Sequence, residues 1–219
     1  MTGGQDSCYP RLPVGSFLDA LAAGAPAPAA GSAAALVLAQ AAALCAKSAR
    51  LSARQLTADR AGQLTAEAEQ LRAEAASLMD EDARAFRAVI EQSRRPADPA
   101  RATGSAEGEA ATQRGCLGAG PAAAAAGDLA IALSRAADVP MRLVELAAPV
   151  AELAASLAAG GNPALRGDAQ TAALLAQAAA RAAAALVRIN LTDTPGDPRL
   201  ARAASLLTRI ARSVEAAAP

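Results

Sequence analysis

The sequence predicts an all-α fold, in which about six alanine-rich helices form one bundle. Two observations lead to this prediction. Apolar residues recur with the period of a helix along most of the chain, and no run of β-branched or aromatic residues alternates long enough to indicate a sheet. Hydrophobic residues make up 53% of the 219 residues but aromatic residues only 1%, so a core must consist mostly of Ala, Leu and Val. We expect residues 1–219 to form a single domain.

The first half of the chain predicts three helices. A short helix over residues 16–24 begins at Ser16, a residue type that caps helix N-termini, and ends at a glycine. Two prolines break the chain before a second helix, which we expect over residues 32–57. A third, long helix covers roughly residues 60–92.

The second half begins with a break in the helical pattern. Residues 96–121 are rich in Pro, Gly and small polar residues, so we expect a flexible loop there, either disordered or acting as a lid. Helices resume over residues 126–137, 140–159 and 168–189, and an amphipathic helix over roughly residues 200–214 closes the chain. Alanine-rich faces bury little apolar area per residue, so we also expect association through helix faces.

Charge and the N-terminus limit the expected partners and compartment. Lys and Arg balance Asp and Glu, and no long block of one sign occurs, so we expect neither nucleic acid nor a membrane as partner. The N-terminus lacks the basic segment and apolar run of a secretory signal, so we expect a cytoplasmic protein. Residues 25–46 are uncharged and about as long as a membrane span, but Ala and Gly dominate them. A buried bundle helix is the better interpretation.

The inventory of reactive side chains is short. The chain has no histidine, and its three cysteines show no metal-ligand or redox spacing, so we expect no metal site and no histidine-based catalysis. Neither of the common glycine-rich nucleotide-binding loops occurs. If the protein is an enzyme, its carboxylates must transfer the protons.

Three acids stand close together in the third predicted helix, and one of them is predicted to point inward. A heptad pattern places Asp82 on the apolar seam of this helix, whereas Asp80 and Glu81 project from other sides. Asp80 can pair with Arg84, four residues later, as an ordinary surface charge. A carboxylate that faces a core needs a partner or has a raised pKa. Asp82 is therefore either part of a buried polar network or a general acid or base.

Further polar residues stand at predicted helix ends and turns. Ser32 and Asp168 occupy positions where helix N-caps belong, and capping explains both without a ligand. The backbone N–H groups that follow Gly31 would also attract an anionic group. Asn190 fits the C-terminal end of a helix, and Asn162, which precedes a proline, is typical of a turn.

Five segments, in this order along the chain, resemble one known family. They are FLDALAAGAPAPAAGSAAAL at residues 17–36, DEDARAF at 80–86, ADVPMRLVELA at 137–147, GNPALRGDAQTAALLAQAA at 161–179 and RINL at 188–191. These patterns are similar to those of the formiminotransferase-cyclodeaminase C-terminal family, which includes methenyltetrahydrofolate cyclohydrolases and formiminotetrahydrofolate cyclodeaminases. The resemblance covers residues 16–191, nearly the whole chain.

The resemblance implies an all-helical homodimer that binds a folate in a cleft near the subunit interface. The substrate would be a tetrahydrofolate derivative, and no covalently bound cofactor is implied. The implied activity is hydrolysis of 5,10-methenyltetrahydrofolate to 10-formyltetrahydrofolate, or deamination of 5-formiminotetrahydrofolate. The catalytic acid-base residue would be Asp82. The residues that bind and orient the substrate would be Gly31, Ser32, Asn162, Asp168 and Asn190.

Two alternatives to an active enzyme stay open. PAAGS at residues 28–32 stands where the family has PGGGS, and Leu186 stands where it has Asn. A family member without turnover would keep a folate-binding role. A helical interaction protein would use Asp82 only as a member of a core polar network.

Overall fold

The computed structural model describes residues 8–94 and 121–218, and it confirms the predicted all-α fold. Within these ranges every regular element is a helix. The elements are, in chain order, η1 (Tyr9–Arg11), α1 (Val14–Ala22), α2 (Ala30–Arg50), α3 (Ala58–Arg94), α4 (Pro121–Ala136), α5 (Asp138–Gly160), η3 (Pro163–Leu165), α6 (Arg166–Asn190) and α7 (Pro198–Ala217). The predicted loop over residues 96–121 lies outside the described residues, except that Pro121 begins α4.

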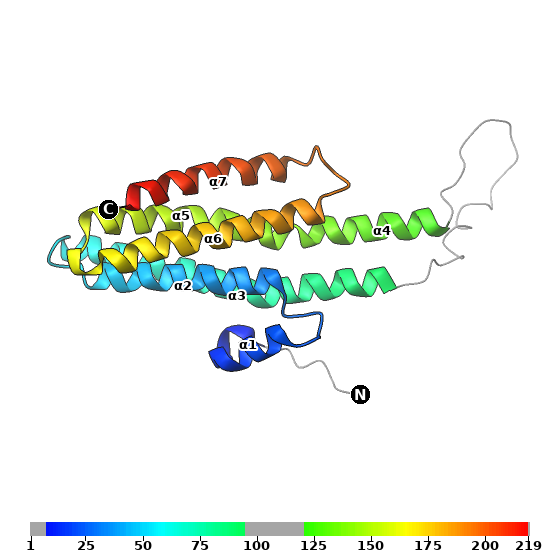
Figure 1. Ribbon diagram of the computed structural model, residues 1–219, viewed down its shortest axis with the longest axis horizontal. Coiled ribbons are helices and arrows are strands. Elements are labelled where there is room, and N and C mark those ends of the chain that lie inside the picture. The colour runs from blue at the N-terminus through cyan, green and yellow to red at the C-terminus, as the bar shows by residue number, and fades with distance from the viewer. Residues whose placement is uncertain (1–7, 95–120, 219) are drawn as a thin grey trace, which may run out of the picture.

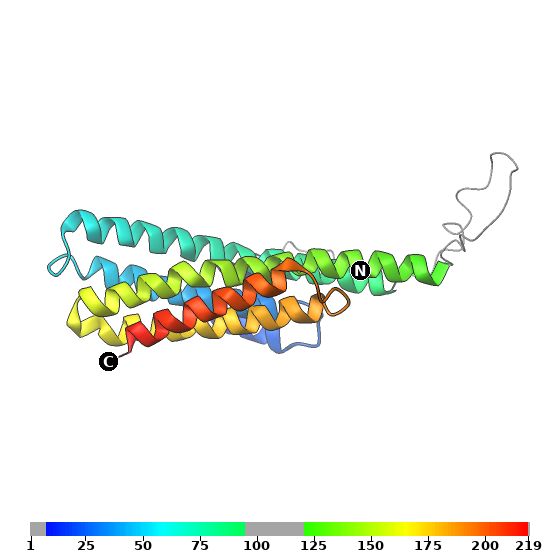
Figure 2. The ribbon, with the colours of Figure 1, turned by 90° about the horizontal axis from the view of Figure 1, so that it is seen from above.

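Helices α2, α3, α5 and α6 lie side by side and form the body of the bundle (Figures 1 and 2). Helix α2 packs against both α3 and α6 and runs antiparallel to each of them. Helix α7 lies on the outside, along α5 and α6. Helix α4 continues the direction of α5, and α4 and the C-terminal part of α3 extend together past the other helices.

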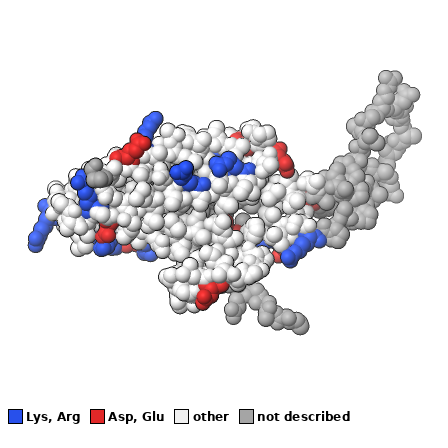
Figure 3. Space-filling model, viewed as in Figure 1, with Lys and Arg blue, Asp and Glu red and all other residues white. Residues whose placement is uncertain are grey.

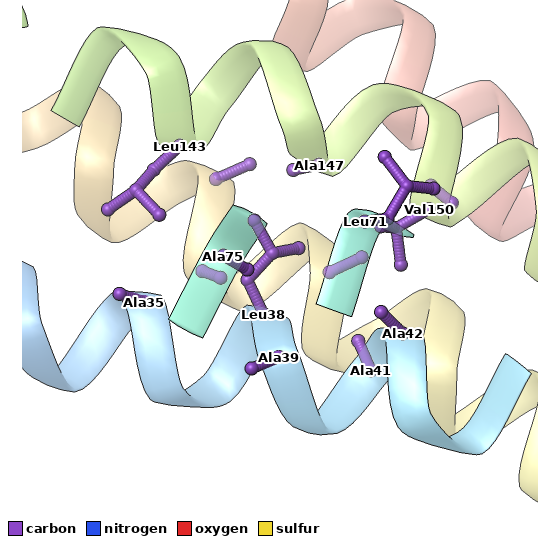
Figure 4. Close-up of a cluster of buried hydrophobic side chains, with 14 of the residues drawn as sticks. Ala35, Leu38, Ala39, Ala41, Ala42, Leu71, Ala75, Leu143, Ala147 and Val150 are labelled. Carbon is purple, nitrogen blue, oxygen red and sulfur yellow. The ribbon is translucent and has the colours of Figure 1, made fainter. Parts of the chain in front are cut away.

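The core has the predicted composition. Its fully buried side chains are mostly Ala, Leu and Val, and the alanines line the contacts between helices. Figure 4 shows one region of it, where Leu38 of α2, Leu71 of α3, and Leu143 and Val150 of α5 lie among several alanines. Because an alanine side chain is a single methyl group, these helices can approach one another closely.

Ion pairs fix how α7 lies on α5. Arg202 pairs with Glu145 at 2.6 Å, and Arg209 pairs with Glu152. The partners on each helix are seven residues apart and pair in the same order, so α5 and α7 run parallel in one register. Pairs this exposed add little stability, but they form in only one register of the two helices.

Helix α2 begins and ends earlier than the sequence predicted. It begins at Ala30 and ends at Arg50, and residues 51–57 form turns. The side chain of Ser52 is buried in these turns, where it donates to the Ser48 carbonyl at 2.7 Å and accepts the N–H of Asn162 at 2.8 Å. This contact with a residue 110 positions away holds the chain in a turn, and no local sequence pattern predicts it.

Three helical stretches in the described part of the chain are long and apolar enough, by length and composition alone, to cross a membrane. They cover residues 30–50, 126–160 and 163–190. About half of each apolar window is buried within the bundle, between 44% and 56% of its residues. The absence of a membrane partner stays a prediction.

Candidate active site around Asp82

Asp82 faces the N-terminal turn of α2, in agreement with the heptad pattern. Its Oδ2 accepts the backbone N–H of Ser32 at 2.8 Å and lies 3.0 Å from the Ser32 hydroxyl oxygen. The first N–H groups of a helix have no partner within that helix, and they carry the positive end of its dipole. The start of α2 therefore supplies a donor and a favourable field to the Asp82 carboxyl group.

Gly31 makes this approach possible. A Cβ on residue 31 would lie 1.9 Å from Asp82 Oδ1 and 2.4 Å from its Cγ, which no real side chain tolerates. The two alanines of PAAGS do not stand at such positions. Ala29 has extended backbone angles, with φ −133° and ψ −162°, and Ala30 is exposed at the first position of α2. The one glycine that the Asp82 contact requires is therefore present.

Ser32 is a partner of Asp82 and not the predicted helix cap. The N-cap of α2 is Ala29, which makes no side-chain capping bond. The Ser32 side chain is fully buried, and its Oγ lies 2.8 Å from the carbonyl oxygen of Met79 as well as near Asp82. Because a hydroxyl has one hydrogen, it donates to only one of these oxygens at a time. With no surface exposed to solvent, Ser32 can act on a ligand only through Asp82.

Burial raises the pKa of Asp82. The desolvation cost of its charged form is larger than the effect of the two Ser32 hydrogen bonds, which lower the pKa. No basic side chain among the described residues forms an ion pair with this carboxylate. A raised pKa makes the carboxylate a stronger base and keeps more of the group protonated at a given pH, which suits a residue that exchanges protons with a substrate.

The two neighbouring acids are bound to other parts of the fold. Asp80 does not pair with Arg84 as predicted, because its Oδ1 accepts the backbone N–H of Tyr9 at 2.9 Å and so attaches η1 to α3. Glu81 forms an ion pair with Arg142 of α5 at 2.5 Å. Glu81 is thus a surface charge, as predicted, whereas Asp80 instead joins two segments of the fold. Helix periodicity gives the direction of a side chain but not the segment that packs over it.

Asp168 and Asn162 also have partners that the sequence did not indicate. Asp168 lies in the first turn of α6, whose N-cap is Leu165, and its Oδ2 pairs with Lys47 Nζ at 2.6 Å. Asn162 caps η3 by accepting the N–H of Ala164, and its side-chain amide donates to the Leu51 carbonyl at 3.1 Å. The turn predicted at Asn162 is therefore the capped start of η3, and the prediction that Asp168 is an N-cap is wrong.

The length of α2 separates the predicted site residues into two groups. Ser32 lies near its N-terminus and Lys47 near its C-terminus, about 22 Å apart along the axis at about 1.5 Å per residue. Because α6 runs antiparallel to α2, its last residue, Asn190, lies at the Asp82 end of the bundle. Asn162 and Asp168 lie at the Lys47 end. Within one chain, Asp82 therefore lies beside Gly31 and Ser32 but not beside all of the predicted site residues.

The described residues contain no cluster of three or more His, Cys, Asp or Glu side chains that could hold a metal ion. At Asp82 the structure presents a half-buried carboxyl group beside a helix N-terminus. Lys47, which pairs with Asp168, is the residue here that the sequence did not indicate. Its status as the one lysine of the chain was the only available signal.

Comparisons with known proteins agree with this architecture. Residues 13–205 match the family described as formiminotransferase-cyclodeaminase. The fold is similar to that of formiminotetrahydrofolate cyclodeaminase from Thermotoga maritima, with a TM-score of 0.69 and 24% sequence identity over 94% of this chain and 92% of that chain. A comparison with curated proteins found no match. Because the family match spans most of its length, the chain belongs to the formiminotransferase-cyclodeaminase family.

Proposed function

We propose that this protein is a folate one-carbon enzyme in which Asp82 is the general acid-base residue. The observation that carries the proposal is the environment of the Asp82 carboxyl group. It is half-buried, it accepts the N–H of Ser32, and its pKa is raised by burial. The segment that contains it matches the family segment in which the catalytic aspartate is expected.

Hydrolysis of 5,10-methenyltetrahydrofolate would use the ionised form of Asp82. The methenyl carbon is the centre of a cationic, amidinium-like bridge and is already electrophilic. Asp82 accepts a proton from water as the water oxygen bonds to this carbon. It returns that proton to N5 as the bond from the carbon to N5 breaks, and the remaining hydroxyl on the carbon releases its proton to solvent to become the carbonyl of 10-formyltetrahydrofolate. The negative carboxylate also stabilises the bound cation.

Deamination of 5-formiminotetrahydrofolate would use the protonated form. As N10 bonds to the formimino carbon, Asp82 donates its proton to the formimino nitrogen. Asp82 then takes the hydrogen of N10 and passes it to the same nitrogen, which leaves as ammonia. The product is the 5,10-methenyl compound. A raised pKa serves both reactions, because it makes ionised Asp82 a stronger base for hydrolysis and keeps more of the group protonated for deamination.

We also propose that the protein acts as a homodimer, in which α2 and α6 form the contact. The outer side of α6 exposes Leu174 and Ile189, which are 56% and 64% exposed, with alanines and two exposed arginines, Arg181 and Arg188, between them. Leu36 and Leu44 on the outer side of α2 are only half-buried. Figure 3 shows that much of this side of the molecule is uncharged, although two groups of Lys or Arg atoms lie over its middle.

A two-fold axis across this face would complete the site. It places the α2 helices of two copies antiparallel, so the Lys47–Asp168 end of one copy lies at the Asp82 end of the other. Asn162 and Asp168 would then act on the substrate held by the partner's Asp82. Asn190 would act on the substrate within its own protomer. Light scattering of the purified protein measures whether the chain is dimeric.

The reaction is tested with the purified protein and 5,10-methenyltetrahydrofolate, whose near-ultraviolet absorbance is lost on hydrolysis. Loss faster than in buffer, and absent in Asp82→Asn, supports the cyclohydrolase. Release of ammonia from 5-formiminotetrahydrofolate, also absent in Asp82→Asn, supports the cyclodeaminase. Tight binding without either reaction would support a folate-binding protein instead. No binding would leave a helical interaction protein with Asp82 in a polar network.

Composition and charge support the remaining parts of the proposal. The chain carries equal numbers of acidic and basic residues, which favours a small-molecule substrate over nucleic acid or a membrane surface. We propose a cytoplasmic enzyme that needs no bound cofactor beyond its folate substrate, and no metal ion.

A further inference from the structure

One aromatic ring reaches the surface of this protein, and it stands next to Asp82. The chain has three aromatic residues, Tyr9, Phe17 and Phe86, and all lie in the described part of the structure. Tyr9 and Phe17 pack edge to face, with ring centroids 6.0 Å apart, and are 6% and 2% exposed. Phe86 has no such partner and is 37% exposed.

The helix brings Phe86 and Asp82 to the same side of α3. Side chains four residues apart lie one above the other, with about 5–6 Å between their Cβ atoms. Helix α2, which holds Asp82 through Ser32, begins at Ala30 and runs antiparallel to α3. Phe86 lies about one turn beyond Asp82, towards the C-terminus of α3. Because the helices are antiparallel, this position lies past the first residue of α2. The ring is therefore left uncovered by the helix that buries the carboxyl group.

We propose that Phe86 is the surface on which the flat pterin ring of the substrate stacks, so that the one-carbon bridge lies over Asp82. The proposal rests on the proposed function. Aromatic side chains bind flat heterocycles by stacking, largely independently of the pattern of hydrogen-bonding groups. A ring face also attracts a nearby cation, and the methenyl bridge is one. Phe86 thus selects substrates that combine a flat ring with a bridge that reaches the carboxyl group.

The test compares three variants with the wild type. Phe86→Leu keeps an apolar side chain and removes the ring, and Phe86→Tyr keeps the ring. Val14→Ala truncates another exposed apolar residue, 61% exposed at the start of α1. The dissociation constants of 5,10-methenyltetrahydrofolate and of stable 5-formyltetrahydrofolate are measured by calorimetry, together with KM and kcat for whichever reaction is found.

We expect Phe86→Leu to raise both dissociation constants and KM by roughly tenfold or more. Its kcat should change much less, because the ring contacts the substrate equally before and during reaction. Phe86→Tyr and Val14→Ala should stay within about twofold of wild type.

If wild type binds and converts folate but Phe86→Leu has the same dissociation constants and KM, the stacking role is wrong and the proposed function stands. If wild type binds no reduced folate, both are wrong. Loss of dimerisation in Phe86→Leu would assign the ring to the subunit contact and also overturn the stacking role.

Discussion

Asp82 lies so close to Gly31 that a single added methyl group on residue 31 would overlap its carboxyl oxygen, at 1.9 Å. Together with the hydrogen bond from the Ser32 N–H to Asp82, 50 residues apart in sequence, the contact joins the first turn of α2 to α3. It explains why a glycine is needed at this position although the backbone angles of α2 do not require one. The catalytic proposal depends on this relationship, since it sets both the position and the burial of the carboxyl group.

Gly31→Ala is expected to displace Asp82 and to lower the free energy of unfolding by about 1–3 kcal/mol, the usual cost of overpacking. Turnover of folate should fall by about 100-fold or more, because the displaced carboxylate no longer meets the reacting carbon. Gly62→Ala in α3 is the matched control. A Cβ there meets nothing within 4 Å, so helix propensity should make this variant as stable as wild type or more stable. Equal effects of both substitutions on activity would contradict the steric role of Gly31.

Asp82 should make stability depend on pH in the direction opposite to that of a salt-bridged aspartate. Its pKa in the folded state is raised above the unfolded value. The fold therefore favours the protonated form, and this contribution is lost as pH rises through the folded pKa. Asp82→Asn, which is never charged, should unfold at a higher temperature than wild type at pH 7. The difference should shrink as pH is lowered below the pKa of a free aspartate. A wild type that is more stable than the variant at pH 7 would contradict the burial argument.

The raised pKa of Asp82 should also show, through the pH dependence of the rate, which of the two reactions the protein catalyses. A cyclohydrolase needs ionised Asp82, so its kcat should fall as pH decreases through the raised pKa. A cyclodeaminase needs the protonated form, so its kcat should fall as pH increases through that value. Steady-state rates measured between pH 4 and pH 9 separate the two. A rate that does not change across this range would exclude Asp82 as the proton-transfer group.

Ser32→Ala tests whether the buried hydroxyl tunes Asp82. The Ser32 hydrogen bonds lower the pKa of this carboxyl group, so removing the hydroxyl should move the pH profile to higher pH. The loss of a buried hydrogen bond should also cost about 1–2 kcal/mol of stability. Ser48→Ala is the control on the same helix, because the Ser48 hydroxyl is buried without a partner in the described structure. That variant should leave the pH profile unchanged and should not destabilise the fold.

Mixing two inactive variants tests the composite site across the dimer. Asp82→Asn and Asp168→Ala should each abolish turnover if the partner's Asp168 completes the Asp82 site. After the subunits are exchanged at equal amounts, half of the dimers are mixed and each has one intact site. About one quarter of wild-type activity should return. If Asp168→Ala is fully active, the Lys47–Asp168 ion pair is only structural, and its loss should cost less than about 1 kcal/mol at this exposure.

The helix boundaries show where local signals fail. Ser32 and Asp168 have the residue types of N-caps, yet both lie inside helices whose caps are Ala29 and Leu165. A helix can begin earlier than its best capping residue when packing of its first turn stabilises it more than a cap does. The early end of α2 has a similar cause, because the Ser52 contact with Asn162 comes from a distant segment.

The sequence by itself determined the all-α fold, the Ala, Leu and Val core and the inward direction of Asp82. These properties follow from the period of the helix, which acts over a few neighbouring residues. Only the tertiary structure decided what each polar group meets. It brought Gly31 and Ser32 to Asp82, Lys47 to Asp168 and Tyr9 to Asp80. Periodicity sets the angle of a side chain about its helix axis, whereas its partner depends on which helices pack together and how far they are shifted along one another.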